Sequence, residues 1–294
     1  MTIVYILFKL SSLHGSITHY FHFFYGVLVP LILEYQKLIK IHKRITIIIE
    51  DDIGPMLRLL LELPIDIKLK CFIEDYDNLD VIVNYLAPMD VQPSACKRDD
   101  KMLLKGWAKK FEHCHYIKVN QFMSKSLQKS NINIEPFDII TIERVVNKSY
   151  KSLQNHNKKQ TKTMLTEEVA KSNGSDRRSI TNHDTMVQNI RECFDQSVLN
   201  VSTEFMPLIY QYALMSNCKV LIAQHGAVLS EIAFLKPGTI VIEIIDEDKI
   251  NSGNNWFKVL ADACQIEHHQ YVVKDSHVTL DLPKFMEFIK SIIK

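Results

Sequence analysis

The chain has 294 residues, 47% hydrophobic and 23% charged, so it can bury a substantial core as one large domain or as two of about 150 residues each. Its 35 basic and 34 acidic side chains nearly cancel, which argues against nucleic acid or an anionic membrane as a partner attracted by overall charge. Six cysteines are scattered without a CxxC pair, which favours free thiols in a reducing compartment and argues against a zinc site.

Hydrophobic periodicity predicts strands and helices that alternate along most of the chain. In the first half we expect a strand at 3–8, a helix at 20–40 interrupted by Pro30, a strand at 45–49, a helix at 56–63, and strands at 67–73, 116–119 and 137–142. In the second half we expect helices at 184–194, 207–215, 227–235, 254–264 and 282–292, and strands at 198–201, 220–223, 239–245 and 269–273. The apolar run at 3–8 is too short for a membrane span, so none is predicted.

This alternation predicts an α/β fold with mostly parallel sheets. Two such series imply two Rossmann-like halves facing a cleft, with the first domain at 1–135 and the second at 136–294. Residues 150–175 are polar and lack sustained periodicity, which predicts a mobile surface insertion in the second domain.

The stretch "VLIAQHGAVLSEIAFLKPGTIVIEII" (220–245) predicts a strand, a tight turn, a short helix and a second strand. His225, Gly226 and Ala227 then lie at the carboxyl end of the first strand, where open parallel sheets bind ligands. Amide groups at the helix start could hold a pyrophosphate, and His225 could donate a hydrogen bond to it. A capped turn with a satisfied core histidine is the alternative.

Three further features suggest nucleotide contacts. Glu243 is a lone carboxylate in an apolar strand, so it could take ribose hydroxyls or form an ion pair at the edge of the sheet. Arg177 and Arg178 precede a helix that Thr181 or Asn182 could cap. Forked guanidinium groups match phosphate geometry, although a solvated charge pair would also explain the two arginines.

Two candidates for acid–base chemistry lie in the first half. His22 follows His19 at a predicted helix start, but no nearby acid completes a metal-binding set. Asp52 follows the strand at 45–49 and could act as a base at the cleft edge, or be a solvated loop residue. We take His22, Asp52 and His225 as the catalytic candidates, and no metal is predicted.

Taken together, these motifs resemble glycosyltransferase family 61, which includes plant xylosyltransferases and animal O-linked GlcNAc transferases. The C-terminal signature of that family is matched by Gln211, His225, Gly226, Ala227, Leu229, Phe234, Leu235, Pro237, Gly238, Val241 and Glu243. The family's Arg-Arg-x-x-x-Asn element is matched by Arg177, Arg178 and Asn182, its strand-end arginine by Arg144, and its N-terminal helix by "FHFFYGVLVPL" (21–31). Ser230-Glu231 replaces a common Thr-Asn, and Gly26 replaces a common aspartate.

The resemblance implies a GT-B enzyme that binds a nucleotide-sugar in its C-terminal domain and the acceptor mainly in its N-terminal domain. It implies an inverting, metal-independent transfer from a UDP-sugar to a glycan hydroxyl, with UDP-xylose as the first expectation and UDP-GlcNAc as the second. The expected donor-binding residues are Arg144, Arg177, Arg178, Asn182, His225, Gly226, Ala227 and Glu243.

Two other functions stay open at this stage. The chain could be a non-catalytic nucleotide-sugar-binding protein, because Gly26 replaces a possible functional aspartate, or another α/β enzyme that acts on phosphorylated substrates. We expect a cytoplasmic protein without a resident cofactor. The scarcity of glycine, only eight residues, with many Ile and Lys, suggests AT-biased coding, which is compatible with a virus-encoded enzyme acting in a host cytoplasm.

Overall fold

The chain forms two compact units. The computed structural model describes residues 3–9, 20–42, 44–49, 56–69, 82–86, 112–144, 178–203, 206–251 and 255–293. One unit comprises residues 1–133 together with Pro207–Tyr212, and the other comprises residues 134–206 and 213–294. The proposed domain boundary at 135/136 and the cleft between two domains remain predictions, and the return of Pro207–Tyr212 to the first unit is not anticipated by the sequence.

The first unit is built on a parallel sheet of four strands. Its order is β3-β2-β1-β4, with β1 at Ile3–Lys9, β2 at Arg44–Ile49, β3 at Asp66–Leu69 and β4 at Ile82–Leu86. Every neighbouring pair in this order is parallel. The strands at 3–8, 45–49 and 67–73 are therefore confirmed in type and approximate position, although residues 70–73 of the third lie outside the described structure. β4 is not among the predicted strands.

The predicted helix at 20–40 contains a wide turn in its middle. α1 (Tyr20–Phe23) continues into the π-helical segment η2 (Phe24–Leu28) and then into α2 (Val29–Leu38). Pro30 lies in the first turn of α2, where it has no N–H to donate to the preceding turn. Just before it, the N–H of Val29 bonds to the carbonyl of Phe24, five residues earlier. The predicted interruption is thus a π-turn within a helical run.

The strand predicted at 116–119 is wrong, because these residues belong to the long helix α5 (His113–Ser130). The buried residues of α5 recur at helical spacing: Tyr116, Val119, Phe122, Met123 and Ser126. Ile117, which would share a strand face with Val119, is 41% exposed. Four residues with three apolar side chains fit either structure, and only the repeat over the following two turns identifies the helix. The helix predicted at 56–63 is confirmed as α3 (Met56–Leu61).

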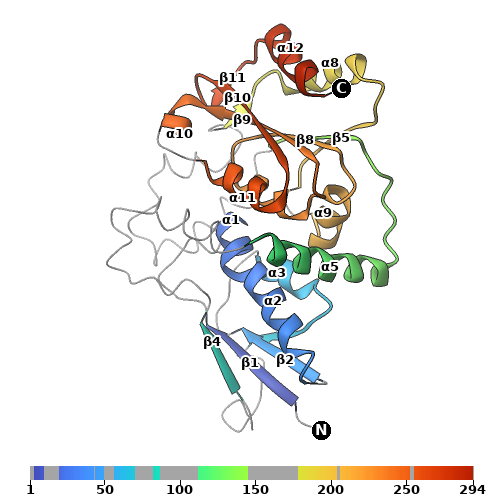
Figure 1. Ribbon diagram of the computed structural model, residues 1–294, viewed down its shortest axis with the longest axis vertical. Coiled ribbons are helices and arrows are strands. Elements are labelled where there is room, and N and C mark those ends of the chain that lie inside the picture. Colours follow the sequence, from blue (N-terminus) through green and yellow to red (C-terminus); the bar gives the residue numbers. More distant parts are fainter. Residues whose placement is uncertain are drawn as a thin grey trace. The chain divides into compact units, whose positions relative to one another are not determined.

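The second unit is built on a parallel sheet of five strands in the order β10-β9-β8-β5-β7 (Figure 1). β5 is Ile139–Ile142, β7 is Val198–Val201, β8 is Val220–Gln224, β9 is Ile240–Asp246 and β10 is Glu267–Val273. All four pairings are parallel, as the alternation of strands and helices predicts. A separate two-stranded ladder joins β6 (Ser179–Ile180) to β11 (His277–Val278).

Helices cover both faces of this sheet (Figure 1). α8 (His183–Cys193) and α12 (Leu282–Ile292) pack their apolar residues over Ile222, Ile242 and Ile244. Because side chains alternate along a strand, Glu243 points to the opposite face. That face carries α11 (Trp256–Cys264), which contacts β10 and the helix that follows β8. α9 (Leu208–Met215) and the short α10 (Glu247–Asn251) complete the described helices.

The crossover between β8 and β9 is a 3-10 helix, η7 (Ala227–Phe234), whereas the sequence predicts an α-helix. Eight residues of 3-10 helix rise about 16 Å, against about 12 Å for an α-helix. A five-residue strand such as β8 is also about 16 Å long. Because a 3-10 helix rises further per residue, eight residues are enough to run back along the whole length of β8. A parallel β9 requires such a return.

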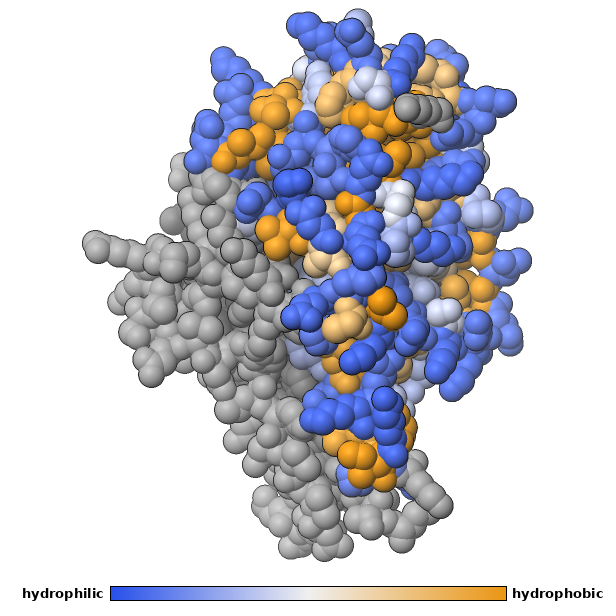
Figure 2. Space-filling model, viewed as in Figure 1, coloured by the Kyte–Doolittle hydropathy of each residue, from blue (hydrophilic) through white to orange (hydrophobic). Residues whose placement is uncertain are grey.

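On the face shown in Figure 2, the described residues are mostly hydrophilic, with hydrophobic residues between them. Large exposed hydrophobic side chains include Ile41 and Leu61 in the first unit and Val272 in the second. None of the described helices is both long enough and apolar enough to cross a membrane.

Candidate functional site

The candidate site lies at the carboxyl edge of the five-stranded sheet. β8 ends at Gln224, His225 and Gly226 follow, and η7 begins at Ala227. β5 ends at Ile142, so Arg144 lies just beyond it. Since β5 and β8 are parallel neighbours, both ends meet at the same edge, where open α/β sheets bind ligands.

Arg144 lies directly against Gly226. A Cβ atom at Gly226 would be 2.0 Å from Nη2 and 2.8 Å from Cζ of Arg144. The backbone of Gly226 is extended, with φ 164° and ψ −178°, which other residues also adopt. The backbone conformation at this position therefore does not itself require glycine. Glycine leaves room for the guanidinium at the start of η7.

His225 is held by a buried carboxylate. Its Nδ1 lies 2.5 Å from Oε1 of Glu243, and its ring packs edge-on against Phe257 of α11. The other oxygen of Glu243 accepts a 2.9 Å hydrogen bond from Nε2 of Gln270. Nε2 of His268 lies 3.1 Å from the same oxygen, within ion-pair distance but without the angle of a hydrogen bond. Both carboxylate oxygens are thus engaged by side chains of the protein.

Glu243 is a buried anion. Burial by itself would raise its pKa, but the hydrogen bond with His225 and the proximity of the imidazoles of His225 and His268 lower the pKa to about 2. Its side chain is only 1% exposed, on a strand in the interior of the sheet. The structure therefore gives Glu243 a contact with His225 within the sheet, and its suggested contact with a ribose remains a prediction.

The arginine motif reaches the same edge through a shared carbonyl. The backbone oxygen of Ser276 accepts one hydrogen bond from Nε2 of Gln224, at 2.5 Å, and another from the N–H of Ser179, at 3.1 Å. Ser179 directly follows Arg178, so the backbone of the half-buried Arg178 lies close to the end of β8. Two motifs separated by more than 40 residues are thereby brought together.

Asn182 has a structural contact. It is the N-cap residue of α8, but its side chain makes no capping bond. Its Nδ2 donates to the carbonyl of Leu280 at 3.0 Å, and its Oδ1 accepts from the N–H of Leu280 at 2.9 Å. The predicted cap is wrong because the side chain pairs with a distant backbone segment, and a role of Asn182 in donor binding remains a prediction.

Glu231 is a second buried carboxyl group in the same crossover. It lies in η7 with 1% of its surface exposed, and burial raises its pKa to about 8 despite a hydrogen bond with Thr203. Its Oε2 has no hydrogen-bond partner among the described residues. The side chain of Glu231 is therefore uncharged at physiological pH. The asparagine that is common at this position in the family that the chain resembles is uncharged too.

Three of the predicted site residues have no described side chain. His22 lies on α1, but its side chain is outside the described structure, as are Asp52 and Arg177. Their catalytic and donor-binding roles stay predictions.

Sequence reasoning missed His268 and Gln270. Both lie on β10, and the register pairs Gln270 with Glu243 and His268 with Val241. Residues paired across parallel strands point to the same face, so both side chains face the carboxylate. The signal was a polar, histidine-rich start to an otherwise ordinary strand.

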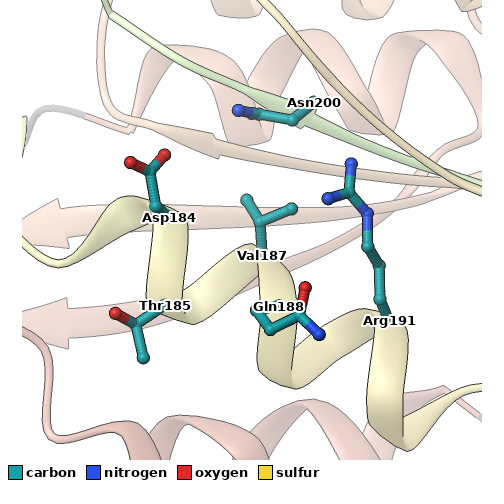
Figure 3. A pocket seen from close by; sticks show the side chains of 6 residues that line it. All are labelled: Asp184, Thr185, Val187, Gln188, Arg191 and Asn200. Carbon is teal, nitrogen blue, oxygen red and sulfur yellow. The ribbon is translucent and has the colours of Figure 1, made fainter.

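A separate hollow of about 480 Å³ lies between α8 and β7 (Figure 3). Asp184, Val187 and Arg191 point from α8 toward Asn200, whose amide already bonds to Thr141 and Glu143. No predicted site residue lines this hollow. It is therefore not the candidate site.

One group of potential metal ligands exists in the described part of the chain: Glu112, Cys114 and His115. It lies at the start of α5, in the other unit. Glu112 and His115 form a capping box there, and Nδ1 of His115 accepts the N–H of Glu112 at 3.0 Å. Helix capping accounts for this arrangement without a metal.

Comparison with known proteins agrees with the geometry. No curated protein sequence matches the chain significantly. The profile of the family described as Glycosyltransferase 61 matches residues 20–242, which include α1, the arginine motif and His225 and end one residue before Glu243. A match over this much of the sequence identifies the chain as a member of glycosyltransferase family 61.

Proposed function

We propose that the protein is an inverting, metal-independent glycosyltransferase of GT-B type that transfers a sugar from a UDP-sugar to a glycan hydroxyl. The observation that carries this proposal is the placement of Arg144 against Gly226 at the start of η7, beside His225. A guanidinium, the N–H groups that begin a helix and an imidazole are three donors suited to one diphosphate. Membership of the family supports the reaction class.

The proposed chemistry is a single displacement. The acceptor oxygen attacks the anomeric carbon, the bond from that carbon to the diphosphate breaks, and its electron pair stays on the departing UDP. Arg144 and His225 stabilise the negative charge that develops there, because fixed donors act most strongly where charge appears in the transition state. The acceptor proton passes to a base, for which His22 and Asp52 are the candidates.

The donor sugar is proposed as xylose first and N-acetylglucosamine second, from the resemblance described above. Stabilisation of the leaving group by cationic side chains makes a metal unnecessary in this proposal. We also propose a reducing, cytoplasmic setting, because Cys114, Cys193, Cys218 and Cys264 are free thiols.

The proposal can be tested first by binding. Thermal shift with UDP, UDP-xylose, UDP-GlcNAc and inorganic phosphate, each with and without EDTA, should show stabilisation by the UDP compounds that survives chelation. Donor hydrolysis and transfer to candidate glycans would follow. Binding without any turnover would favour a non-catalytic nucleotide-sugar-binding protein. Binding of simple phosphates alone would favour another α/β enzyme, and activity that requires Mn²⁺ or Mg²⁺ would overturn the metal-independent mechanism.

Arg144→Ala tests the proposed contact with the diphosphate, and Arg191→Ala is its control. Loss of a charge-assisted phosphate contact should weaken UDP-sugar binding by about 1.5–3 kcal/mol, or roughly 10- to 150-fold. Arg191→Ala removes an arginine of the same unit that lines the separate hollow, and it should bind as the unchanged protein does. Equal binding by both variants would contradict the proposed site.

A further inference from the structure

Glu243 is buried with few groups to balance its charge. Among the described residues, the contacts recorded for its carboxylate are His225 on one oxygen and Gln270 and His268 on the other. Gln270 is neutral, so among these contacts only an imidazole can supply positive charge. An unpaired buried carboxylate would be far more costly than a paired one.

His225 is the better placed of the two imidazoles. Its Nδ1 is 2.5 Å from the carboxylate and forms a hydrogen bond, whereas His268 has ion-pair distance without hydrogen-bond geometry. His225 also lies beside Gly226, at the carboxyl edge where Arg144 is found. Its Nδ1 is directed at the protein, which leaves Nε2 as the nitrogen for a ligand.

The charged groups around His225 agree with a cation at this position. β9 contributes Glu243, β10 contributes His268, and the end of β5 contributes Arg144. α11 presents the uncharged ring of Phe257, while its Lys258 and Asp262 pair with each other on the surface. Glu231 in η7 is neutral. The carboxylate of Glu243 offsets the repulsion that Arg144 would exert on a second cation.

We infer that Glu243 is a positioning residue that keeps a proton on both ring nitrogens of His225, so that Nε2–H donates a hydrogen bond to an anionic ligand. The identity of that ligand, the diphosphate of a nucleotide-sugar, rests on the proposed function. In the transfer step His225 gives up no proton. Its Nε2–H bond to the leaving oxygen strengthens as the sugar–oxygen bond breaks and charge accumulates there.

The first test needs no donor. In the full chain with ¹⁵N-labelled histidine at pH 7.5, the signals of His225, assigned with His225→Gln, should show two protonated nitrogens. Glu243→Gln should leave one, because the amide supplies no negative charge to hold the second proton. Glu267→Gln is a matched control, since it removes a surface carboxylate 2.8 Å from His269 on β10. A singly protonated His225 in the unchanged protein would overturn the inference.

The second test is the pH dependence of donor binding and hydrolysis. UDP-xylose and UDP-GlcNAc are suitable probes, because their phosphates stay ionised between pH 5.5 and 7.5. At pH 7.5 Glu243→Gln should lose about 10-fold or more in binding or rate, and it should recover most of this at pH 5.5. Glu267→Gln should show neither change. Loss that is equal at both pH values, in a protein that remains folded, would assign Glu243 a merely structural role.

A double-mutant cycle keeps the inference separate from general damage. If Glu243 acts through His225, adding Glu243→Gln to His225→Gln should cost no further donor affinity. Additive losses would contradict the inference. If the unchanged protein holds His225 doubly protonated but binds no UDP-sugar, then the proposed function fails while the role of Glu243 in protonating His225 stands.

Discussion

Gly226 shows how one missing side chain can shape a binding site. An added Cβ would lie 2.0 Å from Nη2 of Arg144, although the backbone itself is unstrained. The atom that it meets is the end of a flexible side chain, so the guanidinium can move away at little cost to stability. A larger residue at position 226 should therefore affect ligand binding more than stability, because it displaces Arg144 from the edge of the sheet.

Gly226→Val should therefore weaken UDP-sugar binding about 10-fold or more while changing the melting temperature little. The substitution should have no further effect in an Arg144→Ala background, because the displaced group is already absent. Isothermal titration of both variants and the double variant measures this. A Gly226→Val protein that binds donor normally would show that the position of Arg144 is unimportant.

Glu231 allows a residue-scale prediction about stability. Its pKa is about 8 in the folded protein and near 4.5 when unfolded. The folded state keeps the proton between these values while the unfolded state releases it, so stability falls as pH rises from 4.5 to 8. The slope is about 1.4 kcal/mol per pH unit. Below pH 4.5 and above pH 8 this contribution is constant.

Glu231→Gln should remove that slope, because an amide stays neutral at every pH. Its advantage over the unchanged protein should grow with pH and reach on the order of 3 kcal/mol at pH 7. Urea denaturation at pH 5, 6, 7 and 8 measures the difference, with the exposed Glu287→Gln as control. A difference that does not vary with pH would mean that Glu231 is ionised in the folded state.

The site also shows how far residue patterns reach. The family resemblance puts His225, Gly226 and Arg144 in one donor-binding set, and in the structure they meet because β5 and β8 are parallel neighbours that end at one edge. His268 and Gln270 lie about 25 residues beyond Glu243, and their contact depends on the register of β10 against β9. No local pattern contains that register. The capping role expected of Asn182 fails for the same reason, since its partner Leu280 is remote.

At the scale of elements, long repeats were informative and short ones were not. The strand–helix–strand unit around His225 is found as predicted, because apolar runs of adequate length bracket a clear turn. The four residues at 116–119 were predicted to form a strand, but they belong to α5. Local apolar content does not decide between a 3-10 and an α-helix either, since the span of β8 imposes the geometry of η7.

The helix α5 can be checked by mutation. In a strand Ile117 and Val119 would share a face, whereas in α5 Val119 is buried and Ile117 is 41% exposed. Val119→Asp should thus destabilise the protein by several kcal/mol, through burial of an unpaired charge, while Ile117→Asp should cost less than about 1 kcal/mol. Thermal denaturation followed by circular dichroism distinguishes them. Similar losses of stability in both variants would contradict the helix and favour a strand at 116–119.

At the scale of the whole molecule, the parallel sheets were predictable because the alternation of elements admits few other topologies. The excursion of Pro207–Tyr212 into the first unit was not. Its contacts there include the N–H of Leu208 with Glu62 at 2.8 Å, and Tyr20 with Gln211 at 2.5 Å. These pairs are separated by 146 and 191 residues, so no sequence window contains them. Gln211 is nevertheless part of the family signature, which such a contact would help to explain.

Residues 151–172, which lie outside the described structure, provide the last test. The segment is polar and has no sustained apolar face, so it cannot offset the entropy of ordering its backbone. Its replacement by a short Gly-Ser linker should leave the melting temperature within a few degrees of the unchanged value. Limited proteolysis should likewise cut there first. Unfolding on removal would show that the segment is part of the core, and the division of the chain near residue 135 would need revision. A folded protein with normal donor binding but reduced transfer would assign the segment to acceptor binding or turnover.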